Sequence, residues 1–209
     1  MILIKNGRVV DPVTNTDKIM DVLIKDNKIA EVSEHIEASG AQVIDATGLV
    51  VAPGLVDTHV HFRDPGFTYK EDIETGAKAA AKGGFTMVVC MANTKPAVDN
   101  IETLDYIQKK GEKTGINVLQ TATVTKGLKG TELVDMEQLA ASGAAGFTDD
   151  GIPIMDEKVL LEAMNRAKEL DLPISLHEED PLFIKQPGVN MGEVSEKLSY
   201  GGASRTAED

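Results

Sequence analysis

The sequence predicts an α/β protein with a parallel sheet, preceded by a small strand-rich domain. Two observations predict this. Up to residue 52, short alternating apolar runs are separated or followed by Asn-Gly, Asp-Asn and Thr-Gly turns, which is typical of a small antiparallel unit. After Pro53-Gly54, strand-like apolar runs alternate with helical patterns. We therefore expect two domains, residues 1–52 and residues 53–209.

The elements of the second domain follow in order from their patterns. The run FTMVVCMA is continuously apolar, as expected of a strand buried on both faces, and the preceding alanine-rich helix stops at Gly83-Gly84. Apolar runs of this kind predict strands at residues 54–62, 85–92, 116–124, 144–148 and 172–177. Helical spacing predicts helices at residues 71–84, 101–115, 132–143 and 156–170.

The helix at 156–170 has the clearest pattern. Asp156 is its expected N-cap. One apolar stripe is expected to face the core, formed by Val159, Leu160, Ala163, Met164 and Ala167. Beyond residue 177 the chain is glycine-rich and polar, and its end, ASRTAED, resembles the start of a helix.

Both a (β/α)8 barrel and a doubly wound sheet fit alternating strands and helices. No strand is followed by GxGxxG or GxxxxGK[ST], which disfavours nucleotide binding and favours the barrel. A complete barrel needs eight strands and about 250 residues. The pattern supplies only about five strands after residue 52, fewer than a complete barrel needs.

Composition excludes several classes of partner. The net charge of −13 argues against nucleic acid and against anionic membranes. No apolar run reaches about 18 residues, and the start MILIKNGRVV has the pattern of a strand and not of a signal peptide. The single cysteine, Cys90, fits a reducing compartment, and we expect a cytoplasmic protein with a small-molecule substrate.

Polar residues stand at the ends of four of the five expected strands. His59 and His61 are two positions apart, so a strand would point both side chains to the same face, about 6.6 Å apart. Asn93, Asp150 and His177 follow later strands at their carboxyl ends. Asn, Asp and His are common in turns after strands, but their repetition at successive strand ends predicts a shared site.

Histidine nitrogen and carboxylate oxygen together suit zinc, and less selectively manganese, iron or cobalt. Cys90 lies inside an apolar strand, and we interpret it as a core residue. The pattern therefore predicts a hydrolytic centre with one or two metal ions.

Several motifs resemble those of one family. DTHVHFRDPG, MANTKP, GFTDDGIPI and ISLHEED are similar to motifs of the amidohydrolase superfamily, and most closely of the long, class I type dihydroorotases. The opening MILIKNGRVVDP resembles the N-terminal β-sandwich of that family. The resemblance covers the whole chain and implies a partial (β/α)8 barrel with part of a β-sandwich before it.

The resemblance also implies roles for individual residues. His59 and His61 would bind the more buried zinc ion. Asp150 would bridge two ions or complete the site, and His177 would bind the second ion. Arg63 and Asn93 would hold the carboxylate of the substrate.

The implied activity is the reversible conversion of N-carbamoyl-L-aspartate to L-dihydroorotate in de novo pyrimidine biosynthesis, with one or two zinc ions. The arginine would supply the positive charge that an acidic protein otherwise lacks. The implied partners are a second copy in a homodimer and aspartate transcarbamoylase.

Two features depart from the family pattern. Ala92 stands where proline is expected. Family members are roughly twice as long, so a further metal-ligand histidine and the general acid–base aspartate would lie beyond Asp209. We therefore expect an N-terminal fragment that contains no general acid–base residue and is inactive alone.

Two other functions remain open. Allantoinases and hydantoinases or dihydropyrimidinases would use a carboxylated lysine after the fourth strand, where this sequence reads GFTDDG. A non-catalytic dihydroorotase-like subunit that supports aspartate transcarbamoylase would lose its metal ligands. An α/β domain whose polar strand ends bind nothing is the least specific alternative.

Overall fold

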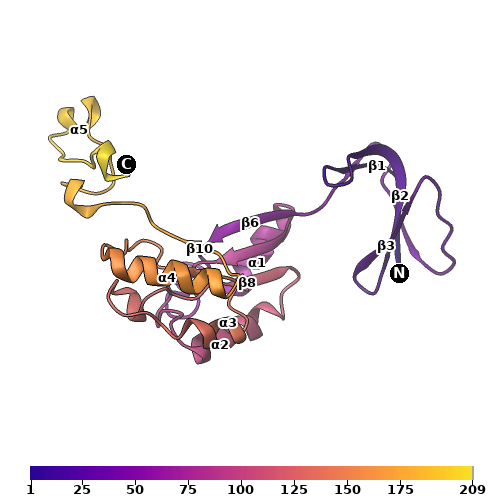
Figure 1. The fold of residues 1–209 in the computed structure, drawn as a ribbon. Helices are drawn as coiled ribbons and strands as arrows, with labels where there is room; N and C mark the ends of the chain where they lie inside the picture. The colour runs from indigo at the N-terminus through magenta and orange to yellow at the C-terminus, as the bar shows by residue number, and fades with distance from the viewer. Residues whose placement is uncertain (209) are drawn as a thin grey trace. The chain divides into compact units, whose positions relative to one another are not determined.

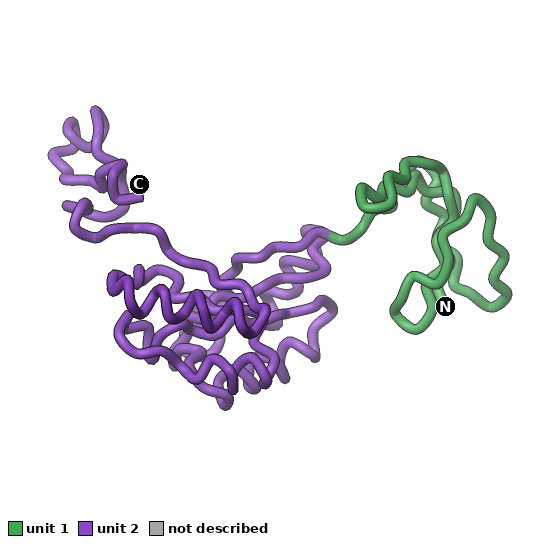
Figure 2. Tube along the Cα trace, viewed as in Figure 1, with its two compact units in different colours: residues 1–54 green, residues 55–209 purple. Residues whose placement is uncertain are grey.

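The chain divides into two compact units in a computed structural model that describes residues 1–208. The units are Met1–Gly54 and Leu55–Asp209 (Figure 2). Asp209, the last residue of the second expected domain and of the ASRTAED segment, lies outside the described residues. Each unit is described by itself.

Unit 1 is one mixed five-stranded sheet with the order β3-β2-β1-β4, in which β5 also pairs with β1. Its strands are β1 (Ile2–Asp11), β2 (Thr16–Lys25), β3 (Lys28–Ser33), β4 (Gln42–Asp45) and β5 (Val50–Val51). The hairpins β1-β2 and β2-β3 are antiparallel, whereas β4 and β5 run parallel to β1. The expected antiparallel pairing is therefore found only among β1, β2 and β3, because the chain leaves β3 by a long connection and returns beside β1 in the same direction.

The strands of unit 2 form two parallel groups. The order β6-β7-β8 is one sheet, and β9 pairs with β10 in the other. A parallel bridge between Ala122 and Phe147 joins the segment after β8 to β9. The strands are β6 (Leu55–Val60), β7 (Phe85–Cys90), β8 (Asn117–Gln120), β9 (Phe147–Thr148) and β10 (Ile174–Ser175). The predicted α/β architecture with parallel strands is confirmed.

In unit 2, a helix follows each of the strands β6, β7, β8 and β9 (Figure 1). They are α1 (Ile73–Lys82), α2 (Ile101–Gly111), α3 (Met136–Ala141) and α4 (Glu157–Glu169). In each case the preceding residue caps the helix by accepting a backbone N–H bond; these residues are Asp72, Asn100, Asp135 and Asp156. The predicted N-cap at Asp156 is confirmed, and short polar side chains at these positions fix where the helices begin.

The core of unit 2 lies between these helices and the strands. Its largest fully buried side chains include Phe147 of β9 and two residues of α2, Leu104 and Ile107. The expected stripe of α4 is only partly buried, since Ala163 and Ala167 are covered while Met164 is 47% exposed. This packing holds the strands so that the loops at their carboxyl ends meet at one edge.

The last part of unit 2 contains only short elements. These are a 3-10 helix (Pro181–Phe183), α5 (Glu193–Lys197) and a second 3-10 helix (Arg205–Ala207). The helix expected at the end of the chain is thus a single 3-10 turn, capped by Ser204. Among residues 1–208, no helix has the length and apolar character needed to cross a membrane.

Candidate metal centre

Strand β6 delivers two histidines to one site. His59 lies in β6 and His61 directly follows it. The rings lie on the same side, with centroids 5.2 Å apart and planes at 68°. The carboxylate of Asp57 accepts a hydrogen bond from the backbone N–H of His59 at 3.0 Å. The alternation of a strand thus brings the two imidazoles together, as the HxH spacing predicts.

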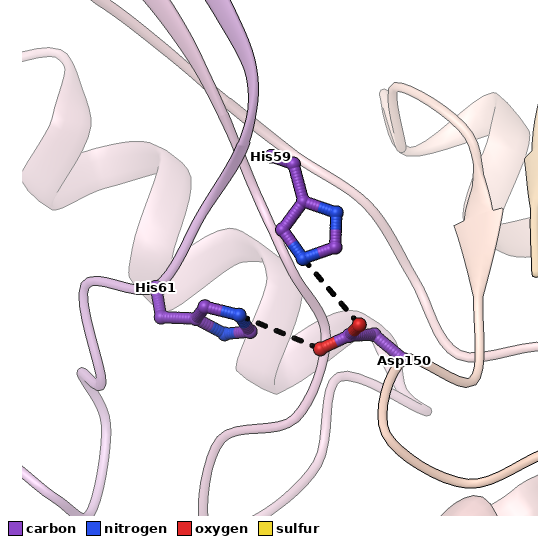
Figure 3. Close-up of side chains that lie close together, drawn as sticks. All are labelled: His59, His61 and Asp150. Atoms are coloured by element: carbon purple, nitrogen blue, oxygen red, sulfur yellow. Dashed lines mark ion pairs between the residues drawn. The ribbon is translucent and has the colours of Figure 1, made fainter. Parts of the chain in front are cut away.

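Asp150 approaches the histidines from the loop after β9. Its Oδ1 lies 3.4 Å from Nε2 of His59, and its Oδ2 lies 3.5 Å from Nε2 of His61 (Figure 3). One ligand atom from each residue can be chosen so that all three lie within 4.8 Å of one another. The site therefore joins two chain segments about 90 residues apart through the parallel order of the strands.

These distances fit a bound divalent ion. Ligand atoms about 2.0–2.2 Å from a tetrahedral zinc ion lie about 3.3–3.6 Å from one another. The two nitrogen–oxygen distances at Asp150 fall within that range, one to each carboxylate oxygen, and one ligand atom from each of the three residues lies within 4.8 Å of the others. Two imidazole nitrogens and a carboxylate are also a donor set that zinc accepts. The three residues present therefore fit such an ion.

Asn93, in the loop after β7, contacts two of these three residues. Its Nδ2 donates to Oδ2 of Asp150 at 2.8 Å and to the Asp150 carbonyl at 3.3 Å. Oδ1, on the other side of the same amide, faces Nδ1 of His61 at 3.0 Å. An amide oxygen only accepts, so this contact needs a proton on Nδ1 of His61 and leaves Nε2 pointing toward Asp150.

Asp149 supports the turn that carries Asp150. This carboxylate is 2% exposed and accepts hydrogen bonds from the backbone N–H of Val124 at 2.7 Å and of Thr125 at 3.1 Å. It also accepts a bond from the Thr125 hydroxyl. Burial raises the pKa of Asp149, and the hydrogen bonds oppose that shift. The sequence analysis assigned no role to Asp149. Its position directly before Asp150 was the available signal, because neighbouring side chains in an extended chain point to opposite sides, and only one of the two carboxylates could then face the histidines.

Arg63 lies in a tight turn two residues after His61. Its backbone has φ +59°, and its carbonyl accepts a hydrogen bond from the N–H of Phe67 at 2.8 Å. Among residues 1–208, the guanidinium of Arg63 forms no ion pair. Its charge is therefore available to an anionic ligand.

His177 lies outside the group formed by His59, His61 and Asp150. Its Nε2 is 3.1 Å from the carboxylate of Glu179, and it lines a hollow with the apolar side chains of Ile154 and Leu160. The structure thus brings together three of the four expected metal ligands. A role for His177 in binding a second ion stays a prediction.

Comparisons with known proteins show the family of this chain. A family model described as "Dihydro-orotase-like" matches residues 48–207. The chain is 59% identical to a protein from Clostridioides difficile named "Dihydroorotase", over the whole of this chain and 50% of that protein. It is 54% identical to a "Dihydroorotase" from Clostridium acetobutylicum, again over the whole chain and 49% of the relative. The chain therefore spans about half the length of the curated relatives it matches.

A solved structure shares the fold. The L-hydantoinase (dihydropyrimidinase) from Arthrobacter aurescens superimposes with a TM-score of 0.75 at 25% sequence identity. The match covers 88% of this chain and 42% of that chain.

Proposed function

This chain belongs to the dihydro-orotase-like family, and from that premise we propose that the protein is a zinc-dependent dihydroorotase. It would interconvert N-carbamoyl-L-aspartate and L-dihydroorotate in de novo pyrimidine biosynthesis. One observation carries the proposal: His59, His61 and Asp150 converge with spacings that fit a zinc ion. Relatives at 54–59% identity carry the name "Dihydroorotase", which supports this substrate over other cyclic amides.

The metal would be held by His59, His61 and Asp150, and His177 would serve a second ion. The proton on Nδ1 of His61, fixed by Asn93, leaves Nε2 free to coordinate. When bound, the ion supplies Lewis-acid polarisation of the amide carbonyl and a lowered pKa for water. His59, His61 and Asp150 would hold the ion between strand β6 and the loop after β9.

Arg63 and Asn93 would bind the carboxylate of the substrate. A guanidinium can donate two parallel hydrogen bonds to a carboxylate, which fixes both position and orientation. Arg63 has no ion-pair partner among residues 1–208, so substrate binding breaks no existing pair. Asn93 would join it from the neighbouring loop by exchanging one of the two bonds that its Nδ2 donates to Asp150 for a bond to the substrate carboxylate.

We also propose that the strands of unit 2 form part of a (β/α)8 barrel and that unit 1 forms part of a β-sandwich. In this proposal the general acid–base aspartate lies beyond Asp209, and the 209-residue chain alone is inactive. The test is an assay of the isolated chain with N-carbamoyl-L-aspartate and zinc, in which robust turnover would contradict the proposal. We further propose that the protein forms a homodimer and associates with aspartate transcarbamoylase. Sedimentation of the full-length protein with and without the transcarbamoylase tests both associations.

The test of the function is a side-by-side assay of the full-length protein with L-dihydroorotate, allantoin and hydantoin. We expect turnover of dihydroorotate to exceed that of the other two by at least about 100-fold, since only dihydroorotate offers a carboxylate to Arg63. Preferential turnover of hydantoin or allantoin would overturn the proposal.

A hydantoinase or allantoinase is the second candidate, and the structural similarity to the Arthrobacter hydantoinase favours it. Such an enzyme is expected to use a carboxylated lysine after the fourth strand. Here β9 is followed by Asp149 and Asp150, and no lysine occurs in the segment GFTDDG. A non-catalytic subunit is disfavoured because its metal ligands would have no reason to remain grouped.

A further inference from the structure

The turn that carries Arg63 is fastened to the loop that carries Asn93. The backbone N–H of Lys95 donates to the carbonyl of Pro65 at 3.1 Å. At Gly66, a side chain would meet the carbonyl oxygen of Lys95 at 2.1 Å. The two loops therefore pack backbone to backbone, and whatever fixes the turn at residues 63–67 also fixes both groups assigned to the substrate carboxylate.

Asp64 anchors this turn to helix α2. Its side chain is fully buried, with 0% exposure, and accepts hydrogen bonds from Nζ of Lys110 at 2.6 Å and from the hydroxyl of Tyr106 at 3.0 Å. Nζ of Lys110 also lies 5.3 Å from the centre of the Tyr106 ring. A buried carboxylate needs such partners, because water cannot reach it. The hydrogen bond to Asp64 raises the pKa of Lys110, so the lysine keeps its charge.

The neighbouring lysine on the same helix, Lys109, pairs with an exposed carboxylate and not with a buried one. Lys109 pairs with Asp105 one turn earlier, and both side chains are largely exposed, at 66% and 48%. Such a pair on the helix surface contributes little to structure. Lys110 thus has a matched control on its own helix, since Lys109 has the same charge and length but no contact with Asp64.

We propose that Asp64, held by Lys110 and Tyr106, is a positioning residue that sets Arg63 for the substrate carboxylate; this inference rests on the proposed function. The anchor acts in two ways. It fixes the peptide next to Arg63, whose backbone has an unusual positive φ. It also commits the carboxylate next to Arg63 in sequence to Lys110 and Tyr106, so this carboxylate does not pair with the Arg63 guanidinium.

The test compares Lys110→Met with Lys109→Met in the full-length protein. We expect Lys110→Met to raise KM for dihydroorotate by about tenfold while kcat changes less, because carboxylate binding is lost and metal chemistry is kept. Lys109→Met should leave KM unchanged, and Lys110→Arg should restore most of the affinity. Equal KM values for the two methionine variants would overturn the inference and leave the proposed function intact.

A second readout does not depend on turnover. The amide hydrogens of Phe67 and Lys95 report on the turn, since they bond to Arg63 and Pro65. We expect both to exchange about tenfold faster in Lys110→Met than in Lys109→Met, and unchanged exchange would overturn the anchor. If the unmodified protein fails to turn over dihydroorotate, the proposed function fails, and exchange alone decides the anchor.

A buried carboxylate without its lysine can prevent folding. Asp64→Asn is the second variant, because it removes the charge and keeps the side-chain volume and an acceptor for Tyr106. The same rise in KM and the same faster exchange are expected from it. A folded Asp64→Asn protein with unchanged KM and unchanged exchange would also overturn the inference.

Discussion

The side-chain amide of Asn93 donates a hydrogen bond to the carboxylate of Asp150 at 2.8 Å. The other end of the same amide accepts from His61 at 3.0 Å. Asn93 thus links two candidate metal ligands that follow strands of different sheets, β6 and β9. The resemblance of MANTKP to a substrate-contact motif does not predict this link, and it gives Asn93 a second role in orienting the ligands.

Replacing Asn93 with alanine should weaken metal binding. Loss of a residue that orients metal ligands typically costs about 10- to 100-fold in affinity, and we expect a loss of that size for zinc. Competition with a chromophoric chelator measures it on the full-length protein. Asn117→Ala is the control, since Asn117 is an exposed strand residue whose side-chain amide donates to the Thr86 carbonyl. Equal affinities in the two variants would show that Asn93 does not orient the site.

Gly76 leaves room for Phe62, the residue after His61. A side chain at Gly76 would lie 2.4 Å from the Phe62 ring. Gly76→Ala should therefore destabilise the protein by about 1–2 kcal/mol, because overpacking outweighs the better helix propensity of alanine. Gly115→Ala meets no atom within 4 Å and should be neutral or slightly stabilising in urea unfolding. A neutral Gly76→Ala would mean that Phe62 moves freely.

Asp21 should make the stability of unit 1 depend on pH. Burial acts to raise the pKa of Asp21, but the N–H groups of Asn6 and Ile36, at 2.9 and 3.0 Å, outweigh it and lower the pKa. A lowered pKa in the folded state stabilises above the unfolded value of about 3.9, and this contribution is lost as pH falls through the folded pKa.

The variant Asp21→Asn should consequently cost about 1–3 kcal/mol at neutral pH and progressively less below pH of about 4. Asp26→Asn, at an exposed turn position, should change the free energy of unfolding by less than about 0.5 kcal/mol. Urea unfolding across the pH range measures both. A cost that does not vary with pH would contradict the role assigned to the ionised Asp21.

Cys90 should be inert in the folded protein. Burial raises the pKa of its thiol to about 12. Since the thiolate is the reactive form, alkylation by iodoacetamide at pH 8 should be about 1,000-fold slower in the native state than in urea. The single cysteine gives a clean stoichiometry by mass spectrometry. Rapid labelling of the native protein would show that β7 opens readily.

The sequence was informative where a pattern is local. The apolar runs and polar caps located β7 and helix α4, and the HxH spacing placed His59 and His61 on one side. Non-local features could not be predicted. The parallel return of β4 beside β1, the exposure of Met164 and the contact of Lys110 with Asp64, 46 residues earlier, all depend on tertiary packing. Asp149 and Asn93 likewise show their contacts only when loops from different strands meet.

The central claim is that His59, His61 and Asp150 together hold a divalent ion. Zinc X-ray absorption on the full-length protein tests it most directly, compared with a His59→Ala/His61→Ala variant and with His35→Ala, which removes an exposed histidine paired with Glu37. The account predicts imidazole scattering at about 2.0–2.1 Å in the unmodified protein and in His35→Ala, and a clear fall of both zinc content and imidazole scattering in the double variant. Zinc content and imidazole scattering in the double variant equal to those of the unmodified protein would contradict it.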